Sequence, residues 1–215
     1  MENALHKITP KGLEVIETLG FTPEHGFMRL ALHMDRMEKT CSRLHYLFDR
    51  GAVLMALGES VDDTPVRLRV TINLDGIVNV KVGSITEVSR WSIGISDKFL
   101  QSNDPWLGVK TTNRALYDTV RSQLIDFDEV LFLNENREVC EGTITNIFVK
   151  KDNILVTPPI SCGCLPGILR EEMLLSGQAQ EGILFLKDLK DGAEVFVGNS
   201  LRGLITADLA ENKLI

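Results

Sequence analysis

The sequence has no excess of positive charge, no long apolar run and no secretory signal, and each absence excludes a class of protein. Lysine and arginine number 23 against 30 aspartates and glutamates, a net charge of −7, whereas a nucleic-acid-binding protein needs a basic surface that neutralises phosphates. No apolar run approaches the roughly 20 residues of a membrane-spanning helix. The first ten residues, MENALHKITP, lack the apolar segment of a secretory signal. We therefore expect a cytoplasmic protein without a nucleic-acid or membrane partner.

Cysteine and histidine are also scarce, with four of each. Two of the cysteines form the tripeptide Cys162-Gly-Cys164, whose spacing is neither that of a CxxC redox motif nor that of a zinc finger. The other two, Cys41 and Cys140, stand apart from it in the sequence. We expect reduced, partly buried thiols, as is usual in the cytoplasm, and no metal site.

What the chain does have is an ordinary globular composition, with 44% hydrophobic and 25% charged residues in a length of 215. A chain of this length buries a substantial core, either as one domain or as two small domains that share a cleft. Such a cleft is the usual place for a small-molecule site.

The first half combines strand and helix patterns. Residues 13–30 predict two short strands joined by a turn. A helix follows, because six apolar residues then recur at spacings of four and three: Leu30, Met34, Met37, Cys41, Leu44 and Phe48. Strict alternation over 65–82, interrupted by the turn residues Asp75 and Gly76, predicts a β-hairpin. Residues 91–95 predict another strand.

The second half is dominated by strand patterns. Residues 109–124 predict a strand end that runs into a helix, and a second helix begins at Ile168. The predicted strands lie at 129–134, 145–151, 154–159 and 194–199. The fold class is therefore α+β. Three regions are predicted: a small N-terminal α/β domain over 1–98, a linker over 99–107 and a β-rich C-terminal domain over 108–215.

The stretch EGTITNIF, from Glu141 to Phe148, places a carboxylate beside residues that are suited to burial. A solvated surface position is one explanation for Glu141. The other is that its carboxylate has a cationic or protonatable partner, which the rest of the chain must help to identify.

Two basic residues could belong to a site, although neither is diagnostic by itself. Lys110 follows the apolar Val109, and a partly desolvated lysine becomes a nucleophilic amine that is able to form a Schiff base. A lysine beside a valine more often reaches solvent along its aliphatic chain. Arg36 lies at the edge of the apolar helix stripe, where its planar guanidinium could bind a phosphate or carboxylate, or could face solvent.

Two loops offer backbone N–H groups to an anion. LPGILR, residues 165–170, ends a loop and begins a helix, and the N–H groups at a helix start attract phosphate. GNSLRG, residues 198–203, adds a serine hydroxyl and further loop amides. Both motifs also occur where no anion binds, so their specificity is low.

Taken together, these residues are what a single site for pyridoxal 5′-phosphate requires. The aldehyde needs a lysine, the phosphate needs an arginine and loop or helix-start amides, and the pyridine nitrogen needs a carboxylate. Glu141 would keep that nitrogen protonated, so that the ring withdraws electrons from a carbanion beside the substrate nitrogen.

The order of these motifs also resembles a known family. Arg36, Lys110, EGTITNIF, TPPISCGCLPGILR and NSLRG follow one another as in the fold type IV pyridoxal-phosphate enzymes, or class IV aminotransferase family, from about Leu13 to Gly203. The family includes D-amino acid and branched-chain aminotransferases and aminodeoxychorismate lyase. The resemblance implies a two-domain fold like that of the D-amino acid aminotransferases, a site in the cleft and a homodimer.

Eight residues match the family's cofactor site by this resemblance. Lys110 would be the Schiff-base lysine and the acid/base, Glu141 the partner of the pyridine nitrogen, and Arg36 a phosphate ligand. Leu165 would pack on the ring. Backbone amides and the rest of the phosphate shell would come from Ile168, Leu169, Asn199 and Ser200.

The motifs Lys-Thr-Thr-Asn-Arg, TPPISCGCLPG and NSLRG look most like those of the lyase. The resemblance thus implies a pyridoxal-phosphate lyase of the folate pathway, which converts 4-amino-4-deoxychorismate to 4-aminobenzoate and pyruvate. Branched-chain aminotransferases carry a tyrosine five residues after the lysine, where this chain has Ala115, and commonly a threonine at Leu169. An aminotransferase for branched-chain or D-amino acids is the alternative, and a cofactor-binding paralogue without turnover is a third hypothesis.

Overall fold

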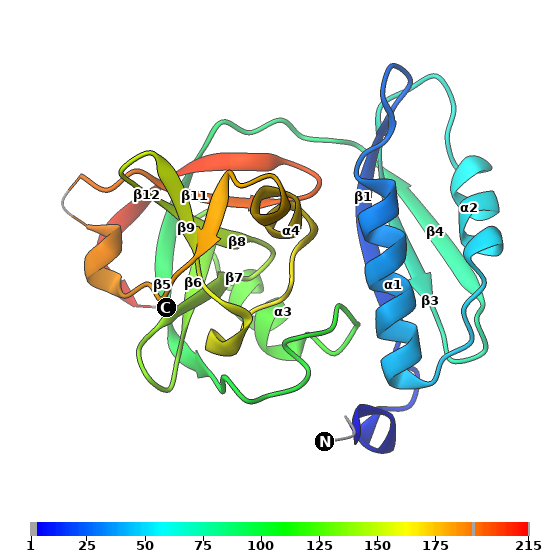
Figure 1. The fold of residues 1–215 in the computed structure, drawn as a ribbon, viewed down its shortest axis with the longest axis horizontal. Coiled ribbons are helices and arrows are strands. Elements are labelled where there is room, and N and C mark those ends of the chain that lie inside the picture. Colours follow the sequence, from blue (N-terminus) through cyan, green and yellow to red (C-terminus); the bar gives the residue numbers. More distant parts are fainter. Residues whose placement is uncertain (1–3, 191, 215) are drawn as a thin grey trace. The chain divides into compact units, whose positions relative to one another are not determined.

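The computed structural model describes residues 4–190 and 192–214. Contacts divide the chain into two compact units (Figure 1). The smaller unit consists of Met1–Thr86 and Val109–Asn113, and the larger unit of Glu87–Gly108 and Arg114–Ile215. Helices and strands are present in both units, which confirms the α+β class.

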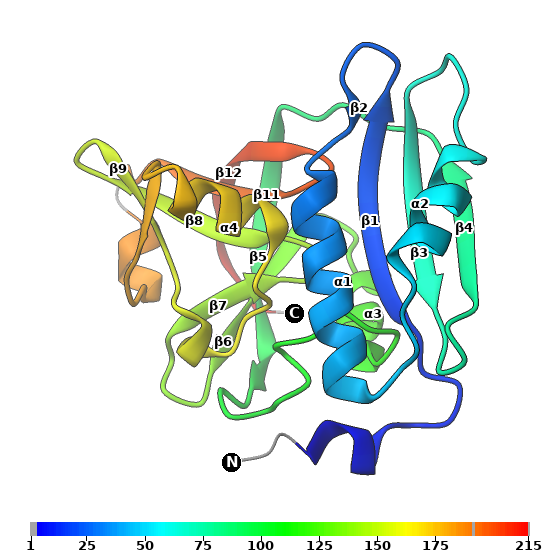
Figure 2. The ribbon, with the colours of Figure 1, turned by 45° about the vertical axis from the view of Figure 1, so that its right-hand side comes forward.

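The smaller unit is a four-stranded sheet in the order β2-β1-β3-β4 with two helices. Both β1–β3 and β3–β4 are antiparallel pairs, as the alternating pattern over 65–82 predicts for the second. Figure 2 shows α1 alongside β1 and α2 in front of β3 and β4. The elements are η1 Ala4–Ile8, β1 Val15–Thr22, β2 Gly26–Phe27, α1 Leu30–Leu44, α2 Arg50–Gly58, β3 Val66–Ile72 and β4 Val78–Gly83.

The apolar stripe of α1 is buried as predicted. Met34, Met37 and Cys41 are at most 1% exposed. The helix ends at Leu44, because the next residue adopts a left-handed conformation with φ of 58°, so the predicted sixth member of the stripe lies beyond it. Helix α2 was not predicted, since its apolar residues are consecutive and form no single stripe. The Asp49 carboxylate caps α2 by accepting two backbone N–H groups.

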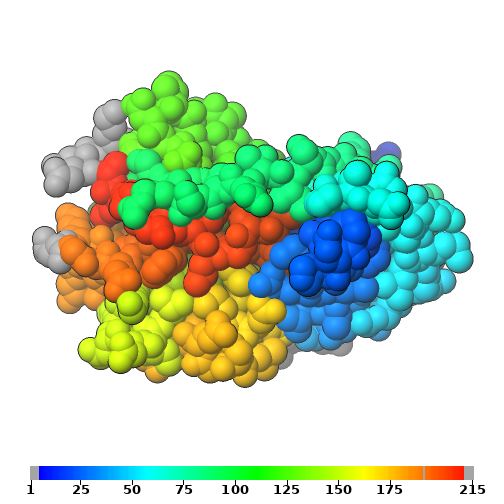
Figure 3. Space-filling model, turned by 90° about the horizontal axis from the view of Figure 1, so that it is seen from above, coloured from blue at the N-terminus to red at the C-terminus, as the bar shows by residue number. Residues whose placement is uncertain are grey.

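The larger unit is an eight-stranded mixed sheet in the order β10-β9-β8-β11-β12-β5-β6-β7. Strand β5 pairs in parallel with both β12 and β6, and Figure 3 shows the red β12 alongside it. The elements are β5 Arg90–Leu100, α3 Ala115–Ser122, β6 Glu129–Asn134, β7 Val139–Gly142, β8 Asn146–Lys151, β9 Ile154–Thr157, η2 Ile160–Cys162, α4 Ile168–Leu175, β10 Ala179–Glu181, η3 Leu186–Leu189, β11 Val195–Asn199 and β12 Gly203–Leu214.

Strand β6 is buried along its whole length. Leu131 and Leu133 belong to the main core inside the curled sheet. Val130 and Phe132, which alternate with them, pack instead in a second cluster with Tyr117 of α3. Because both faces of β6 are covered, its register with its neighbours is strongly specified.

The division between the units differs from the boundary expected from sequence. Strand β5 runs to Leu100 and pairs with β6 and β12, so the region after Glu87 belongs to the larger unit. The short segment Val109–Asn113 belongs to the smaller unit, because it pairs with β1. The backbone N–H of Ile16 donates to the Lys110 carbonyl oxygen at 2.9 Å, and Thr111 bridges to Val15.

In the part of the chain that the structure describes, no helix has the length and apolar character needed to cross a membrane.

Candidate active site

Glu141 is buried in the larger unit, and its carboxylate accepts hydrogen bonds from Tyr117 and Leu165. It lies on β7 and is 6% exposed. One oxygen accepts the Tyr117 hydroxyl at 2.7 Å, and the other accepts the backbone N–H of Leu165 at 3.0 Å. The solvated position that the sequence left open for Glu141 is thus excluded.

Tyr117, on α3, was not predicted as part of the site. Its ring packs edge-on against Phe132, with centroids 5.1 Å apart, and the Arg114 guanidinium lies 4.9 Å from the ring centroid. Burial, followed by the nearby Glu141 carboxylate, raises the pKa of Tyr117 well above its ordinary value. The phenol therefore stays protonated and remains a hydrogen-bond donor. The sequence signals only the buried face of α3 and gives no partner for the hydroxyl.

Leu165 lies just before the start of α4, which has no side-chain cap. While its N–H donates to Glu141, its carbonyl oxygen accepts the Asn146 side-chain amide at 3.0 Å. The N-cap of α4 is Gly167, which supplies no side-chain acceptor, and a Cβ there would collide with the Asn146 side chain. A helix start of this kind presents backbone N–H groups and a positive partial charge to an anion. Those groups begin with the predicted residue Ile168.

The end of β11 lies against the start of α4. A Cβ on Gly198 would lie 2.7 Å from the Leu169 side chain. The Asn199 side chain is already engaged: its Oδ1 accepts the N–H groups of Leu201 and Arg202, both at 3.1 Å, and its Nδ2 donates to the Ile144 carbonyl oxygen at 3.2 Å. The Asn199 amide thus shapes the turn.

Within the larger unit, the structure therefore brings several predicted residues into one region. Ser200 is buried in the same turn, at 6% exposed. The group comprises Glu141, Leu165, Ile168, Leu169, Asn199 and Ser200.

Arg36, in the smaller unit, is not a solvated helix arginine. It is 9% exposed, and its guanidinium binds the Glu17 carboxylate of β1 through two bonds, from Nε at 2.8 Å and from Nη2 at 2.6 Å. His33 Nδ1 lies 2.6 Å from the same carboxylate and must carry the proton, because an ionised carboxylate only accepts. The sequence did not predict Glu17 as a partner, since the pair joins residues 19 apart.

The Glu17 carboxylate is charged because of these partners. Burial by itself raises the pKa of Glu17, but Arg36 and His33 outweigh burial and lower the pKa from 4.5 to about 2. The pair therefore fixes the Arg36 guanidinium against β1.

Lys110 belongs to the segment that pairs with β1 in the smaller unit, and it is half-buried. Its carbonyl bond to Ile16 fixes the backbone at this residue. The four cysteines are free thiols, and all four are buried. Among residues 4–190 and 192–214, no three histidine, cysteine or acidic side chains gather as metal ligands do.

Comparison with known proteins gives a family match over most of the chain. The family described as amino-transferase class IV matches residues 14–208. A Schizosaccharomyces pombe protein provisionally named aminodeoxychorismate lyase is 30% identical over 185 residues, which are 80% of each chain. A Thermotoga maritima protein provisionally named branched-chain-amino-acid aminotransferase is 29% identical over 102 residues, or 45% of this chain, but only 37% of that relative is covered.

A solved structure from Mesorhizobium loti, provisionally named an amino-acid aminotransferase, has the same fold. Its TM-score is 0.88 at 36% identity, and the match covers 92% of this chain and 100% of that one. The resemblance to fold type IV enzymes drawn from the motifs is confirmed.

Proposed function

We propose that this chain, which belongs to the class IV aminotransferase family, is a lyase. It would convert 4-amino-4-deoxychorismate to 4-aminobenzoate and pyruvate. Family membership makes the chain an enzyme with pyridoxal 5′-phosphate as its cofactor and a small molecule as its substrate. The lyase is favoured over other activities of the family by the match with the S. pombe protein. This match covers four fifths of both chains.

The residues of the larger unit suit this cofactor. The buried Glu141 carboxylate is a fitting acceptor for a protonated pyridine nitrogen, and Tyr117 and Leu165 hold it in place. The open start of α4 suits the phosphate, because backbone N–H groups and the helix dipole favour an anion. We propose that the N–H groups of Ile168 and Leu169 bind the phosphate, with Ser200 and Asn199 completing the shell and Leu165 packing on the ring.

From the smaller unit we propose two further contributions. Arg36 would bind the phosphate, because its planar guanidinium, which the Glu17 carboxylate fixes in place, suits an anion with several acceptor oxygens. Lys110 would bond the aldehyde carbon through Nζ. Both assignments rest on the family's motif order.

Bound pyridoxal phosphate supplies an electron sink for bond changes at the substrate carbon that carries nitrogen. Once the substrate amine has taken its place at the aldehyde carbon, the freed Lys110 Nζ would take the proton from the substrate carbon and return it to the methylene carbon of the departing pyruvate. Glu141 would hold the proton on the pyridine nitrogen throughout. Loss of pyruvate leaves an aromatic product that retains its amino group. The reaction needs no second substrate.

The direct test is to incubate the purified, cofactor-loaded protein with 4-amino-4-deoxychorismate and to measure 4-aminobenzoate and pyruvate. We expect both in equal amounts without any added 2-oxo acid, and none from Lys110→Ala. Borohydride reduction followed by peptide mass spectrometry should place the cofactor on Lys110. Labelling of Lys98 or Lys150 instead would overturn the assignment.

An aminotransferase is the second candidate, supported by the M. loti structure and its 36% identity over that whole chain. Transamination transfers the amino group to the cofactor, so leucine, valine or D-alanine alone should change the visible spectrum of the enzyme quickly. Little change with these amino acids, together with 4-aminobenzoate formation, is the result expected of the lyase. A fast change without any 4-aminobenzoate would make the second candidate correct.

We also propose that the protein is a homodimer, as the motif resemblance implies. Light scattering of the loaded protein should then give twice the chain mass of 24.0 kDa. A monomer that is active at the same concentration would contradict this.

A further inference from the structure

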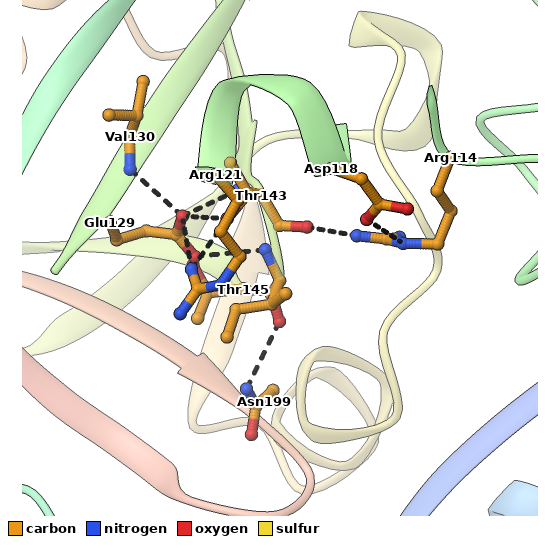
Figure 4. A network of polar contacts seen from close by, with 9 residues as sticks. Arg114, Asp118, Arg121, Glu129, Val130, Thr143, Thr145 and Asn199 are labelled. Carbon is orange, nitrogen blue, oxygen red and sulfur yellow. Dashed lines mark hydrogen bonds and ion pairs between the residues drawn. The ribbon is translucent and has the colours of Figure 1, made fainter. Parts of the chain in front are cut away.

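Glu129 is a buried, extensively hydrogen-bonded carboxylate of the larger unit, and no step of the proposed reaction uses it. It is the first residue of β6 and is 0% exposed. Its two oxygens accept five hydrogen bonds (Figure 4). The donors are the backbone N–H groups of Val130, Thr143 and Ile144 and the hydroxyls of Thr143 and Thr145.

Four of these donors belong to the turn that directly follows Glu141, the Gly142–Thr145 turn. The carboxylate lies close beneath its backbone, because a Cβ on Gly142 would be 2.8 Å from the Glu129 carboxyl group. The turn also closes on itself, with the Gly142 N–H donating to the Thr145 carbonyl oxygen at 2.8 Å. Glu129 therefore organises the inner side of the turn.

The outer side of the same turn is bound by residues of the candidate site. The Ile144 carbonyl oxygen accepts the Asn199 amide at 3.2 Å. The Thr143 carbonyl oxygen accepts the guanidinium of Arg114, the residue four positions after Lys110. Figure 4 shows these contacts on one turn, with Glu129 on the opposite side.

We propose that Glu129 is a positioning residue of the active site: its carboxylate fixes the Gly142–Thr145 turn, and the turn fixes Glu141, Asn199 and Arg114. The inference rests on the proposed cofactor role of Glu141. Tyr117 and Leu165 bind the Glu141 carboxylate itself. The backbone on either side of Glu141 is fixed by the pairing of β7 with β6 and by this turn. Loosening the turn therefore frees one end of the residue that faces the cofactor.

The variant Glu129→Gln tests this, because it keeps the shape but replaces one accepting oxygen by an amide NH₂ that cannot accept. The matched control is Glu135→Gln in the hairpin at the other end of β6, where an exposed glutamate accepts from Ser102. Hydrogen–deuterium exchange of the peptide spanning 142–146, read by mass spectrometry, should speed up about tenfold or more in Glu129→Gln, as for a lost bond to a charged acceptor. The control should exchange at the wild-type rate.

The functional readout is the affinity for pyridoxal phosphate, measured by titration of the cofactor-free protein, together with the visible spectrum of the loaded protein. We expect the affinity of Glu129→Gln for pyridoxal phosphate to fall about tenfold, because Glu141 is displaced. For the same reason, the pH dependence of the visible absorption band should differ from that of the wild type. The proposal would be overturned if Glu129→Gln lowered the melting temperature but kept the wild-type cofactor affinity and visible spectrum. Glu129 would then be a purely structural residue.

Thr145→Val provides a milder second variant in case Glu129→Gln does not fold. It removes one hydroxyl donor, at 3.0 Å from Glu129 Oε2, without changing charge or shape. We expect about a threefold loss of cofactor affinity and faster exchange of 142–146. Unchanged affinity in this variant would overturn the proposal.

The tests of Glu129 are independent of the lyase assay, because hydrogen exchange and cofactor titration do not depend on which substrate the enzyme uses. Failure of the lyase assay with the wild type would refute the proposed function without deciding the role of Glu129.

Discussion

Among the side chains that the structure describes, Glu17 of the smaller unit and Glu129 of the larger unit are the fully buried carboxylates, and the two are stabilised in different ways. Glu17 and Glu129 are both 0% exposed. In the smaller unit Glu17 is bound by ionisable side chains, Arg36 and His33. In the larger unit Glu129 is bound mainly by neutral N–H and O–H groups of a single turn. Glu17 thus joins two elements, α1 and β1, whereas Glu129 fixes the conformation of a single turn.

The difference determines what is left behind when each carboxylate is removed. Without Glu17, the Arg36 guanidinium would lose its buried counter-ion, which is costly. Without the charge of Glu129, mostly neutral donors would remain, and the nearest cation, the Arg121 guanidinium at 3.6 Å, is 37% exposed. We therefore expect Glu17 to govern stability and Glu129 to govern local order.

The largest effect should come from Glu17→Gln, which removes one partner of a buried ion pair. We expect the free energy of unfolding to fall by roughly 3–5 kcal/mol, because the buried Arg36 guanidinium loses the negative charge of the carboxylate that binds it twice. Urea denaturation at pH 7 measures this, with Glu24→Gln on the exposed β1–β2 turn as the control. A loss below about 1 kcal/mol, typical of a surface pair, would remove the distinction between the two carboxylates.

Glu141→Gln extends the comparison to Glu141, another buried carboxylate, whose partners include the neutral donors Tyr117 and Leu165. We expect the variant to fold and retain cofactor, because the amide keeps one accepting oxygen. Turnover should fall by about 10²–10³, roughly 3–4 kcal/mol, since a neutral amide cannot hold the pyridine nitrogen protonated. Saturated turnover of the loaded variant is the measurement. Near-normal turnover would mean that Glu141 has only a structural role.

Acid should weaken the smaller unit through Glu17. Its pKa is about 2 in the folded protein against an ordinary value of 4.5. A lowered pKa contributes stability that is fully present above about pH 4.5 and is lost as the pH falls towards 2, by roughly 3 kcal/mol in total. Unfolding measured at pH 4.5, 3.5 and 2.5 should show this loss in the wild type and a smaller one in Glu17→Gln. Equal slopes in both proteins would refute it.

The smallest effect should come from Tyr117→Phe, which removes the hydroxyl donor to Glu141 while keeping the ring packing on Phe132. We expect a loss of about 1 kcal/mol in stability, the usual contribution of one hydrogen bond, and a several-fold lower turnover. Tyr46→Phe is the control, because its hydroxyl donates to the Leu13 carbonyl oxygen in the other unit. The control should lose similar stability but keep its turnover.

Much of the fold and part of the site could be predicted from the sequence. The spacing of Met34, Met37 and Cys41 predicted α1, and the alternation over 65–82 predicted the β3–β4 hairpin. These patterns are local, since side-chain direction repeats with the backbone period. The stretch EGTITNIF singled out Glu141 as either a solvated residue or one with a cationic or protonatable partner, and the structure excludes only the solvated position, because Glu141 is buried.

What only the tertiary structure decided is which polar groups meet. Glu17 and Arg36 come together because α1 packs on β1, and Glu129 lies beneath the Gly142–Thr145 turn because β6 and β7 pair with Leu131 opposite Gly142. A shift of one residue in that register would turn Glu129 to the other face of the sheet. A hydrogen bond needs placement to within a few tenths of an ångström, and for residues distant in sequence only the packing of whole elements fixes it.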